Sequence, residues 1–260
     1  MSARTGTILD RIVAETRVAV EQRKSRAGAL QAPLGKRQGR PFRDALAAPG
    51  VGVIAEFKRR SPSAGSLHDA PRLASILSAY EQGGAVASSI LTEEPNFGGS
   101  LADLAEARGA CALPLLRKDF IVDPFQIGEA RGAGADAILL IVAVLSDPEL
   151  ASLHRTAREA GLDVLVEVHD GEELARAAAA GAEIIGVNNR DLRDFSVDVE
   201  RTGRLMGQMP PNAIVVSESG ISSPAQLATL GEQGVHAVLV GEALMRSPDP
   251  ALALRSLRAA

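Results

Sequence analysis

The sequence of 260 residues has no tryptophan, one tyrosine and one cysteine, and aromatic residues make up only 3% of it. A single cysteine, Cys111, cannot form an intramolecular disulfide, and it also excludes a zinc site built on cysteines. Such sparse use of cysteine is typical of a reducing compartment. We therefore expect a cytoplasmic protein whose fold does not depend on disulfides.

Long apolar runs are also missing, because no run approaches the roughly 20 residues that a membrane-spanning helix needs. The segment Met1 to Val20 lacks the apolar stretch of a secretory signal, and Asp10 and Glu15 argue against a transit peptide. Neither sign of charge is in large excess, because the chain has 28 basic and 32 acidic residues and a net charge of −4. We expect neither a nucleic-acid partner nor a membrane partner.

Eight short apolar runs recur along the chain at fairly regular spacing, and most are rich in valine and isoleucine. Continuous apolar runs of this length are typical of parallel strands that are covered on both faces. With 46% hydrophobic and 23% charged residues, the chain can form a packed core. The runs are Val51–Phe57, Ala85–Leu91, Ala112–Leu116, Ala137–Leu145, Val164–Val168, Ile184–Val187, Ala213–Val216 and Ala237–Val240.

Amphipathic stretches separate these runs, and several begin with a proline at the first helical turn: Pro71, Pro124, Pro148 and Pro224. Eight strands alternating with helices close naturally into a (β/α)8 TIM barrel, for which about 250 residues is a typical length. An open doubly wound sheet is the alternative, but no G-x-G-x-x-G follows Phe57. We predict one barrel domain over residues 1–260.

About 48 residues precede the first predicted strand, and they form an N-terminal helical extension over residues 1–48. Ile8, Ile12, Val13, Thr16 and Val20 follow helical spacing within Thr7–Arg23, and a second short helix begins at Pro41-Phe42. The extension is too small for a domain of its own. We expect it to pack on the barrel, over one of its ends.

Charged side chains end three of the predicted strands, where barrels of this type carry their catalytic residues. Glu56 and Lys58 lie two residues apart and so point the same way along a strand. Lys118 follows the third strand, and Glu167 ends the fifth, where a buried carboxylate needs a cationic partner. Each residue alone could belong to a structural ion pair or a solvated turn. We interpret His169 as a supporting group rather than one that touches substrate.

Glycines follow the last two strands, where barrels commonly bind phosphate. Gly220 and Gly241 each stand between a strand and a helix start, so backbone N–H groups can approach an anion there. Either glycine alone could mark a plain turn, but together they indicate a phosphate site. Glu218 and Ser219 are adjacent, so both can face the mouth only if the strand ends at that point.

These residues together resemble the indole-3-glycerol phosphate synthase family, and the resemblance covers the whole chain. The most specific match is Ile54-Ala55-Glu56-Phe57-Lys58-Arg59-Arg60-Ser61-Pro62-Ser63, in which Arg60 replaces the small residue that the family usually has. The other matching segments are Arg117-Lys118-Asp119-Phe120, Glu167-Val168-His169, Asn188-Asn189-Arg190-Asp191-Leu192 and Ser217-Glu218-Ser219-Gly220-Ile221.

The resemblance implies ring closure, decarboxylation and dehydration of 1-(2-carboxyphenylamino)-1-deoxyribulose 5-phosphate to indole-3-glycerol phosphate, in tryptophan biosynthesis. It implies a carbon–carbon lyase that needs no metal or organic cofactor and binds a small phosphorylated substrate. The catalytic residues that it implies are Lys118, Lys58, Glu167, Glu56, Asn188 and Ser219. The substrate-binding residues that it implies are Ser61, Phe97, Phe120, Leu139, Arg190, Glu218, Gly220, Gly241 and Glu242.

Within this assignment, Lys118 is the expected acid at the ketone oxygen, and Lys58 and Glu167 are candidates for the dehydration step. A lysine exchanges protons near neutral pH only when its pKa is lowered, which a second lysine favours and carboxylates oppose. Phe97 lies in the segment Pro95-Asn96-Phe97-Gly98-Gly99, which we interpret as a glycine-rich loop able to act as a lid. We expect a monomer.

Three other functions remain open on the residues alone. A Schiff-base aldolase-like barrel would use Lys118 or Lys58 as its nucleophile. Phosphoribosylanthranilate isomerase is a second phosphate-binding barrel, which does not need two strand-end lysines beside a glutamate. A barrel that only binds a phosphorylated ligand is the third, and the set of Lys58, Lys118 and Glu167 argues against it.

Overall fold

The computed structural model describes residues 7–27, 40–68, 71–191 and 195–259. Part of the predicted N-terminal extension (residues 28–39) and the motif residue Leu192 lie outside these ranges. Within them, the predicted parallel barrel is confirmed.

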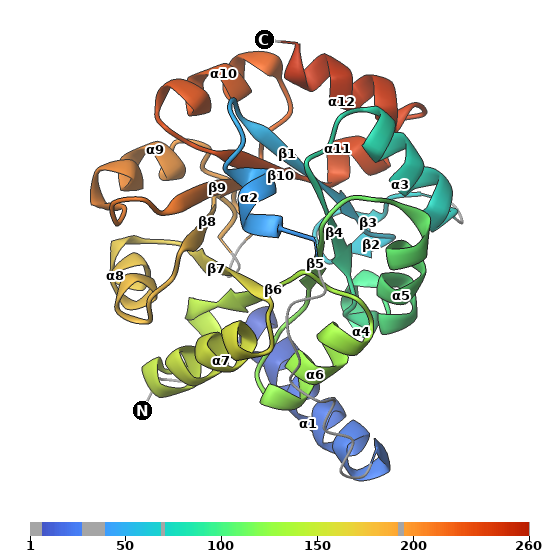
Figure 1. The fold of residues 1–260 in the computed structure, drawn as a ribbon, viewed down its shortest axis with the longest axis vertical. Coiled ribbons are helices and arrows are strands. Elements are labelled where there is room, and N and C mark those ends of the chain that lie inside the picture. The colour runs from blue at the N-terminus through green and yellow to red at the C-terminus, as the bar shows by residue number, and fades with distance from the viewer. Residues whose placement is uncertain (1–6, 28–39, 69–70, 192–194, 260) are drawn as a thin grey trace.

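Eight parallel strands close into a barrel in the order β1-β10-β9-β8-β7-β6-β5-β4 (Figure 1). β1 closes the barrel, because it pairs in parallel with β4 on one side and with β10 on the other. The strands are β1 (Gly52–Phe57), β4 (Ala87–Leu91), β5 (Leu115–Lys118), β6 (Ala137–Ile141), β7 (Asp163–Val168), β8 (Ile184–Asn188), β9 (Ile214–Glu218) and β10 (Ala237–Val240). A small hairpin, β2 (Arg60–Ser61) with β3 (Gly65–Ser66), follows β1.

Helices form an outer ring around the strands (Figure 1). They are α3 (Leu73–Gln82), α5 (Leu101–Ala110), α6 (Pro124–Gly132), α7 (Asp147–Glu159), α8 (Gly171–Ala179), α9 (Arg201–Leu205), α10 (Pro224–Glu232) and α12 (Pro250–Arg258). Shorter turns are α4 (Glu94–Phe97), η1 (Val142–Val144), η2 (Met206–Gln208) and α11 (Glu242–Met245). The predicted helix starts at Pro124 and Pro224 are confirmed. Asp123 and Ser223, the residues before these prolines, cap the two helices through capping boxes.

Two strand boundaries differ from the predicted runs by three residues or more. The third strand begins at Leu115 rather than Ala112 and continues to Lys118, so Arg117 and Lys118 lie within the strand. The run that begins at Ala137 leaves the sheet after Ile141 and forms η1. At both places, the continuous apolar run indicated buried chain, but it did not indicate where the hydrogen bonds of the sheet begin or end.

Side chains alternate along each strand between two separate cores. Inward-facing residues such as Ile54, Leu139 and Leu165 fill the barrel, and outward-facing residues such as Val53 and Ile138 pack under the helices. Because of this alternation, the side chains of Glu56 and Lys118 point inward, to the same side as the apolar residues that fill the barrel below them. The charged residues therefore form the top layer of the inner core.

The N-terminal extension covers both ends of the barrel rather than one. The buried Phe42 and Leu46 of α2 (Phe42–Leu46) pack into the inner core. Backbone N–H groups of Arg40 and Arg43 donate to Asp136 and Asp163, which lie where β6 and β7 begin. These bonds hold α2 against the amino-terminal end of the barrel, which Figure 1 views with α2 near its centre. The long helix α1 (Ile8–Ala27) packs at the other end, against α6 and η1.

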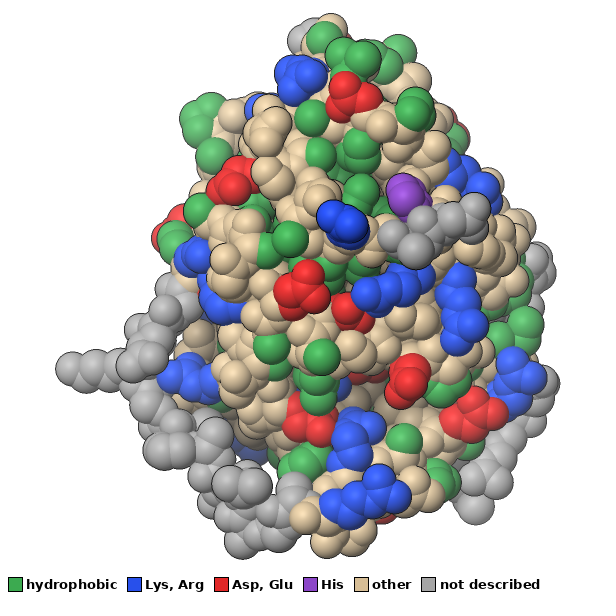
Figure 2. Space-filling model, turned by 90° about the vertical axis from the view of Figure 1, so that its right-hand side faces the viewer, with side chains coloured by type: hydrophobic (Ala, Val, Ile, Leu, Met, Phe, Trp, Pro, Cys, Tyr) green, Lys and Arg blue, Asp and Glu red, His purple; other side chains and the backbone are tan. Residues whose placement is uncertain are grey.

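Acidic and basic side chains alternate over the face drawn in Figure 2, so neither sign of charge dominates there. Among the described residues, no helix is both long enough and apolar enough to cross a membrane.

Candidate active site

A pocket with a volume of about 480 Å³ opens at the carboxyl ends of the strands. All fifteen predicted site residues line it. They are Glu56, Lys58, Ser61, Phe97, Lys118, Phe120, Leu139, Glu167, Asn188, Arg190, Glu218, Ser219, Gly220, Gly241 and Glu242. The loops and strand ends therefore bring together residues that lie up to about 190 positions apart in the sequence.

Lys118 lies between two carboxylates at the pocket floor. Its Nζ is 3.0 Å from Oε2 of Glu167 on β7 and 3.3 Å from Oε2 of Glu218 on β9. Glu218, which the family resemblance implies as a substrate-binding residue, also contacts the lysine directly through its carboxylate. Because β9 ends at Glu218, the side chain faces the mouth together with that of Ser219, as a strand end requires.

Lys58 forms a second ion pair, in which its Nζ is 2.7 Å from Oε1 of Glu56. The backbone carbonyl of Glu56 accepts a hydrogen bond of 3.0 Å from the buried hydroxyl of Tyr80 on α3. A Cβ at Gly241 would stand 2.5 Å from Oε1 of Glu56. Glycine at position 241 therefore leaves room for this carboxylate, in addition to any approach of an anion to the backbone.

The carboxylates around Lys118 decide its protonation state. Burial favours the neutral amine, but the negative charges of Glu167, Glu218 and Glu56 outweigh burial and raise the pKa of Lys118 above its ordinary value. Lys118 is therefore an ammonium group at neutral pH in the ligand-free protein. The lowered pKa that proton exchange by a lysine would need is not present in this state.

The two carboxyl groups that contact Lys118 have opposite pKa shifts. For Glu167, burial acts to raise the pKa, but Lys118 and His169 outweigh it and lower the pKa. For Glu218, burial and the neighbouring carboxylates raise the pKa to about 7, against the opposing effect of Lys118. Glu167 is thus an ionised carboxylate, and Glu218 titrates in the neutral range.

His169 supports Glu167 from outside the pocket, as the sequence analysis expected. Its Nε2 is 3.6 Å from Oε1 of Glu167, and its Nδ1 is 3.0 Å from Oε2 of Glu173 on α8. Burial lowers the pKa of His169, but the two glutamates outweigh it and raise the pKa. The imidazole therefore lies behind Glu167, between two carboxylates.

Asn188 links Glu167 to the residues that follow β8 and β9. Its Nδ2 donates to Oε1 of Glu167 at 3.1 Å, and its Oδ1 accepts from the hydroxyl of Ser219 at 2.9 Å and from the N–H of Arg190 at 3.0 Å. Ser219 has a φ of 67°, a left-handed conformation that non-glycine residues rarely adopt. The strained backbone and the hydrogen bond together fix the serine hydroxyl in the mouth.

Backbone N–H groups gather in the loops after β9 and β10. Gly220 has a φ of 83°, and a Cβ there would collide with Val197 and Val199. The first turn of α11 presents N–H groups of Glu242 and Ala243 that have no acceptor within the helix. The side chain of Glu242 instead pairs with Arg246 at 3.1 Å, so it points away from an anion in this place.

Apolar side chains form the remaining wall. The rings of Phe97 and Phe120 are 6.4 Å apart between centroids, and Leu139 lies nearby in the same pocket. Phe97 does not belong to a loop, because it ends the short helix α4, which Gly98 terminates with a φ of 67°. Sequence reasoning missed one part of this wall: Ile8, Leu9 and Ile12 of α1. Their helical spacing was visible, but it did not indicate which end of the barrel they cover.

Among the described residues, no group of three or more histidine, cysteine, aspartate or glutamate side chains is arranged to hold a metal ion. Glu56, Glu167 and Glu218 are each paired with a lysine.

The profile of the family "Indole-3-glycerol phosphate synthase" matches residues 9–257. The chain belongs to the indole-3-glycerol phosphate synthase family. An indole-3-glycerol phosphate synthase of Nocardioides sp. is 47% identical over 254 residues, which cover 96% of this chain and 98% of that protein. Indole-3-glycerol phosphate synthase 2 of Streptomyces coelicolor is 52% identical over 218 residues, or 84% of each chain.

Solved structures outside the indole-3-glycerol phosphate synthase family share the fold. Thiamine phosphate pyrophosphorylase from Pyrococcus furiosus superposes with a TM-score of 0.60 at 19% identity, covering 80% of this chain and 94% of that chain. A tryptophan synthase alpha subunit from the same organism gives 0.60 at 14% identity, covering 79% and 97%. These similarities confirm the barrel, and the family match favours the synthase over the aldolase and the isomerase.

Proposed function

We propose that two separate ion pairs divide the acid–base work of this enzyme, with Lys118 and Glu167 acting first and Lys58 and Glu56 acting later. The chain is a carboxy-lyase of tryptophan biosynthesis, and its reaction forms indole-3-glycerol phosphate. The observation that carries the proposal is the distribution of contacts. Lys118 Nζ contacts Glu167 and Glu218, whereas Lys58 Nζ contacts Glu56.

Ring closure requires the ketone carbon of the substrate to become electrophilic. The Lys118 ammonium group donates a hydrogen bond or a proton to the ketone oxygen as a ring carbon of the anthranilate part attacks. The raised pKa of Lys118 suits this role, since it guarantees a proton to give. The attacking carbon carries the carboxyl group, so no proton leaves the substrate in this step. The ionised carboxylate of Glu167, oriented by Asn188, holds the Lys118 ammonium group beside the ketone oxygen.

Decarboxylation then restores the aromatic system, and dehydration completes the indole. Dehydration needs an acid at the departing hydroxyl, and the Lys58 ammonium group is the second cation at the mouth. Glu56 holds Lys58 in place at 2.7 Å and accepts the proton that leaves the carbon next to the ring nitrogen. Ring closure and loss of water are thus assigned to different lysines.

The two anionic ends of the substrate are assigned to different parts of the pocket. Arg190, Ser219, Gly220, Gly241 and the N–H of Glu242 hold the phosphate, since backbone donors at a helix start favour an anion. The anthranilate ring lies against the apolar wall that Phe97, Phe120 and Leu139 form. Ser61 is a buried residue of the β2–β3 hairpin and closes the pocket beside Lys58.

The experiment supplies 1-(2-carboxyphenylamino)-1-deoxyribulose 5-phosphate and measures carbon dioxide and indole fluorescence separately. The wild type should release both in equal amounts. Lys118→Ala should release neither, because ring closure precedes decarboxylation. Lys58→Ala should release carbon dioxide faster than indole appears. Equal loss of both products in the Lys58→Ala variant would refute the division of roles.

A small phosphorylated substrate is thus the partner that the pocket is built to hold. The cytoplasmic location, the monomeric state and the single-domain span of residues 1–260 remain predictions.

A further inference from the structure

Helix α1 reaches the active-site pocket with one end and the outer helices with the other. Near its start, Ile8, Leu9 and Ile12 line the pocket. Ile12 is buried in the same apolar cluster as Phe120. The start of α1 therefore roofs the part of the pocket where the aromatic wall lies.

The far end of α1 is fastened to α6 by two ion pairs. Arg23 donates from Nε and from its terminal nitrogen to the two oxygens of Glu129, at 2.7 and 3.1 Å. Lys24 Nζ is 3.0 Å from Oδ2 of Asp123. A bidentate arginine–carboxylate pair fixes orientation as well as distance, so Arg23 sets how α1 lies along α6.

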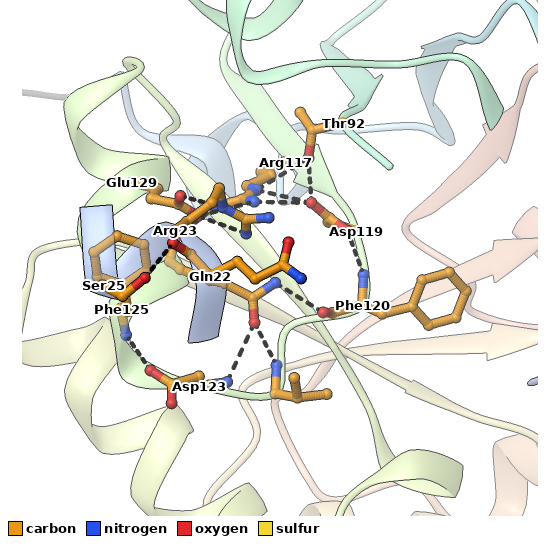
Figure 3. A network of polar contacts seen from close by, with 12 residues as sticks. Gln22, Arg23, Ser25, Thr92, Arg117, Asp119, Phe120, Asp123, Phe125 and Glu129 are labelled. Carbon is orange, nitrogen blue, oxygen red and sulfur yellow. Dashed lines mark hydrogen bonds and ion pairs between the residues drawn. The ribbon is translucent and has the colours of Figure 1, made fainter. Parts of the chain in front are cut away.

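Glu129 also contacts a buried arginine directly beside the catalytic lysine. Its Oε2 is 3.5 Å from Arg117, whose side chain is only 1% exposed. Arg117 precedes Lys118 on β5, so the two side chains point to opposite faces of the barrel wall. A buried guanidinium needs carboxylate partners, and Asp119 at 2.8 Å is the other one. Figure 3 shows Arg23, Glu129, Arg117 and Asp119 as one continuous network.

The guanidinium of Arg117 in turn fixes the segment that carries two pocket residues. It donates to the hydroxyl of Thr92 at 3.0 Å and to the carbonyl of Gln126 at 2.7 Å. Asp119 accepts the N–H of Phe120 at 2.8 Å, and the amide of Gln126 donates to the carbonyl of Phe120 at 2.9 Å. The backbone on both sides of Phe120 is therefore bound to partners of Arg117.

We propose that Glu129 couples the docking of α1 to the placement of Lys118 and Phe120, through Arg117. Arg23, Glu129 and Arg117 are then positioning residues for ring closure. The inference rests on the proposed function, in which Lys118 acts on the ketone. Removal of Arg23 leaves Glu129 with Arg117 as its partner. The network of Arg23, Arg117, Glu129 and Asp119 then changes from two cations and two anions to one cation and two anions.

Arg17 provides a matched control. It also fastens α1, through a 3.0 Å contact with Glu149 on α7, but neither residue touches the Arg117 network. Arg23→Ala and Arg17→Ala each remove one surface tether of the same helix. If the tethers serve only to hold the roof, both variants should change KM alike and leave the rate of ring closure unchanged.

The test measures single-turnover formation of carbon dioxide with enzyme in excess. We expect Arg23→Ala to slow this step by about 5- to 50-fold, since small misplacements of catalytic groups cost up to about 100-fold. Arg17→Ala should keep the wild-type rate. Arg23→Lys, which retains the cation, should recover part of the loss. Glu129→Gln should slow the step similarly, and the double variant Arg23→Ala, Glu129→Gln should be no slower than either single variant, since both break one coupling.

Equal rates for Arg23→Ala and Arg17→Ala would overturn the inference, as would additive losses in the double variant. Arg23 and Glu129 are partly exposed, and thermal unfolding of each variant checks that the fold persists. The Lys118→Ala variant distinguishes a failure of the proposed function from a failure of the coupling through Glu129. An active Lys118→Ala enzyme refutes the proposed function, whereas an inactive one beside a normal Arg23→Ala enzyme refutes only the coupling through Glu129.

Discussion

Oε2 of Glu218 lies 3.3 Å from Nζ of Lys118, while Oε1 of the same carboxyl has no hydrogen-bond partner among the described residues. A Cβ at Gly186 would stand 2.2 Å from this second oxygen, so the carboxyl is packed against the backbone of β8. The ionised form of Glu218 is thus solvated by little except Lys118. This is the physical reason that its pKa rises to about 7.

The raised pKa of Glu218 predicts a pH dependence of stability. Between pH about 4.5 and about 7 the folded protein retains a proton that the unfolded chain has lost, so the free energy of unfolding falls as pH rises through this window. Glu218→Gln removes this contribution. The free energy of unfolding of the wild type, relative to the variant, should therefore drop by up to about 3 kcal/mol between pH 5 and pH 8. Denaturant unfolding at both pH values measures it, and a constant difference would contradict the shift.

Lys118→Ala should reduce kcat by about 10²- to 10⁴-fold, the usual contribution of a positioned acid. The folded state should persist, because the alanine leaves Glu167 and Glu218 able to take up protons in place of the lost cation. Indole fluorescence measures kcat, and circular dichroism checks the fold. Near-normal turnover in a folded variant would refute the role of Lys118.

Arg190→Ala should act mainly on KM, raising it by roughly 10- to 100-fold, the value of a hydrogen bond to a charged group. Its side chain lines the pocket and donates to the carbonyl of Phe195 at 3.0 Å. Steady-state kinetics over a range of substrate concentrations separates the two constants. A fall in kcat without any change in KM would argue against phosphate binding by Arg190.

Two substitutions of Ser219 distinguish the contribution of its hydroxyl to activity from the cost of its left-handed backbone conformation to stability. Ser219→Ala and Ser219→Gly both lose the 2.9 Å hydrogen bond to Asn188, but only glycine adopts a φ of 67° without strain. We expect both variants to lose activity equally and the glycine variant to be more stable by about 1 kcal/mol. Kinetics and thermal unfolding on the same samples test this. Retained activity in the glycine variant would show that the hydroxyl is dispensable.

Much of the barrel and of its site could be predicted from the sequence, because strand alternation and strand ends are local properties. Glu56, Lys58, Lys118 and Glu167 could be placed at one mouth, since parallel strands in a barrel share an end. The contact of Glu218 with Lys118 could not be predicted in this way. It depends on where β9 ends and on the space that Gly186 leaves on the neighbouring strand.

Long-range packing explains the remaining differences. Gly241 suggested an anion site, yet its missing Cβ also accommodates Glu56 from a strand almost 190 residues earlier in the chain. The apolar face of α1 predicted a helix packed on the barrel, but nothing in its spacing assigned Ile8 and Ile12 to the pocket. The protonation state of Lys118 depends on three carboxylates from three other strands, so only the assembled structure shows that they outweigh the burial.

Tyr80 gives this enzyme an optical label of its own. It is the only tyrosine in a chain without tryptophan, and its hydroxyl is bonded to the backbone of Glu56 at the end of β1. The near-ultraviolet circular dichroism of the free protein therefore comes chiefly from one ring attached to the catalytic strand. A ligand without ultraviolet absorption, such as inorganic phosphate, can be followed through this ring, and any movement of Glu56 on binding becomes visible without introducing a probe.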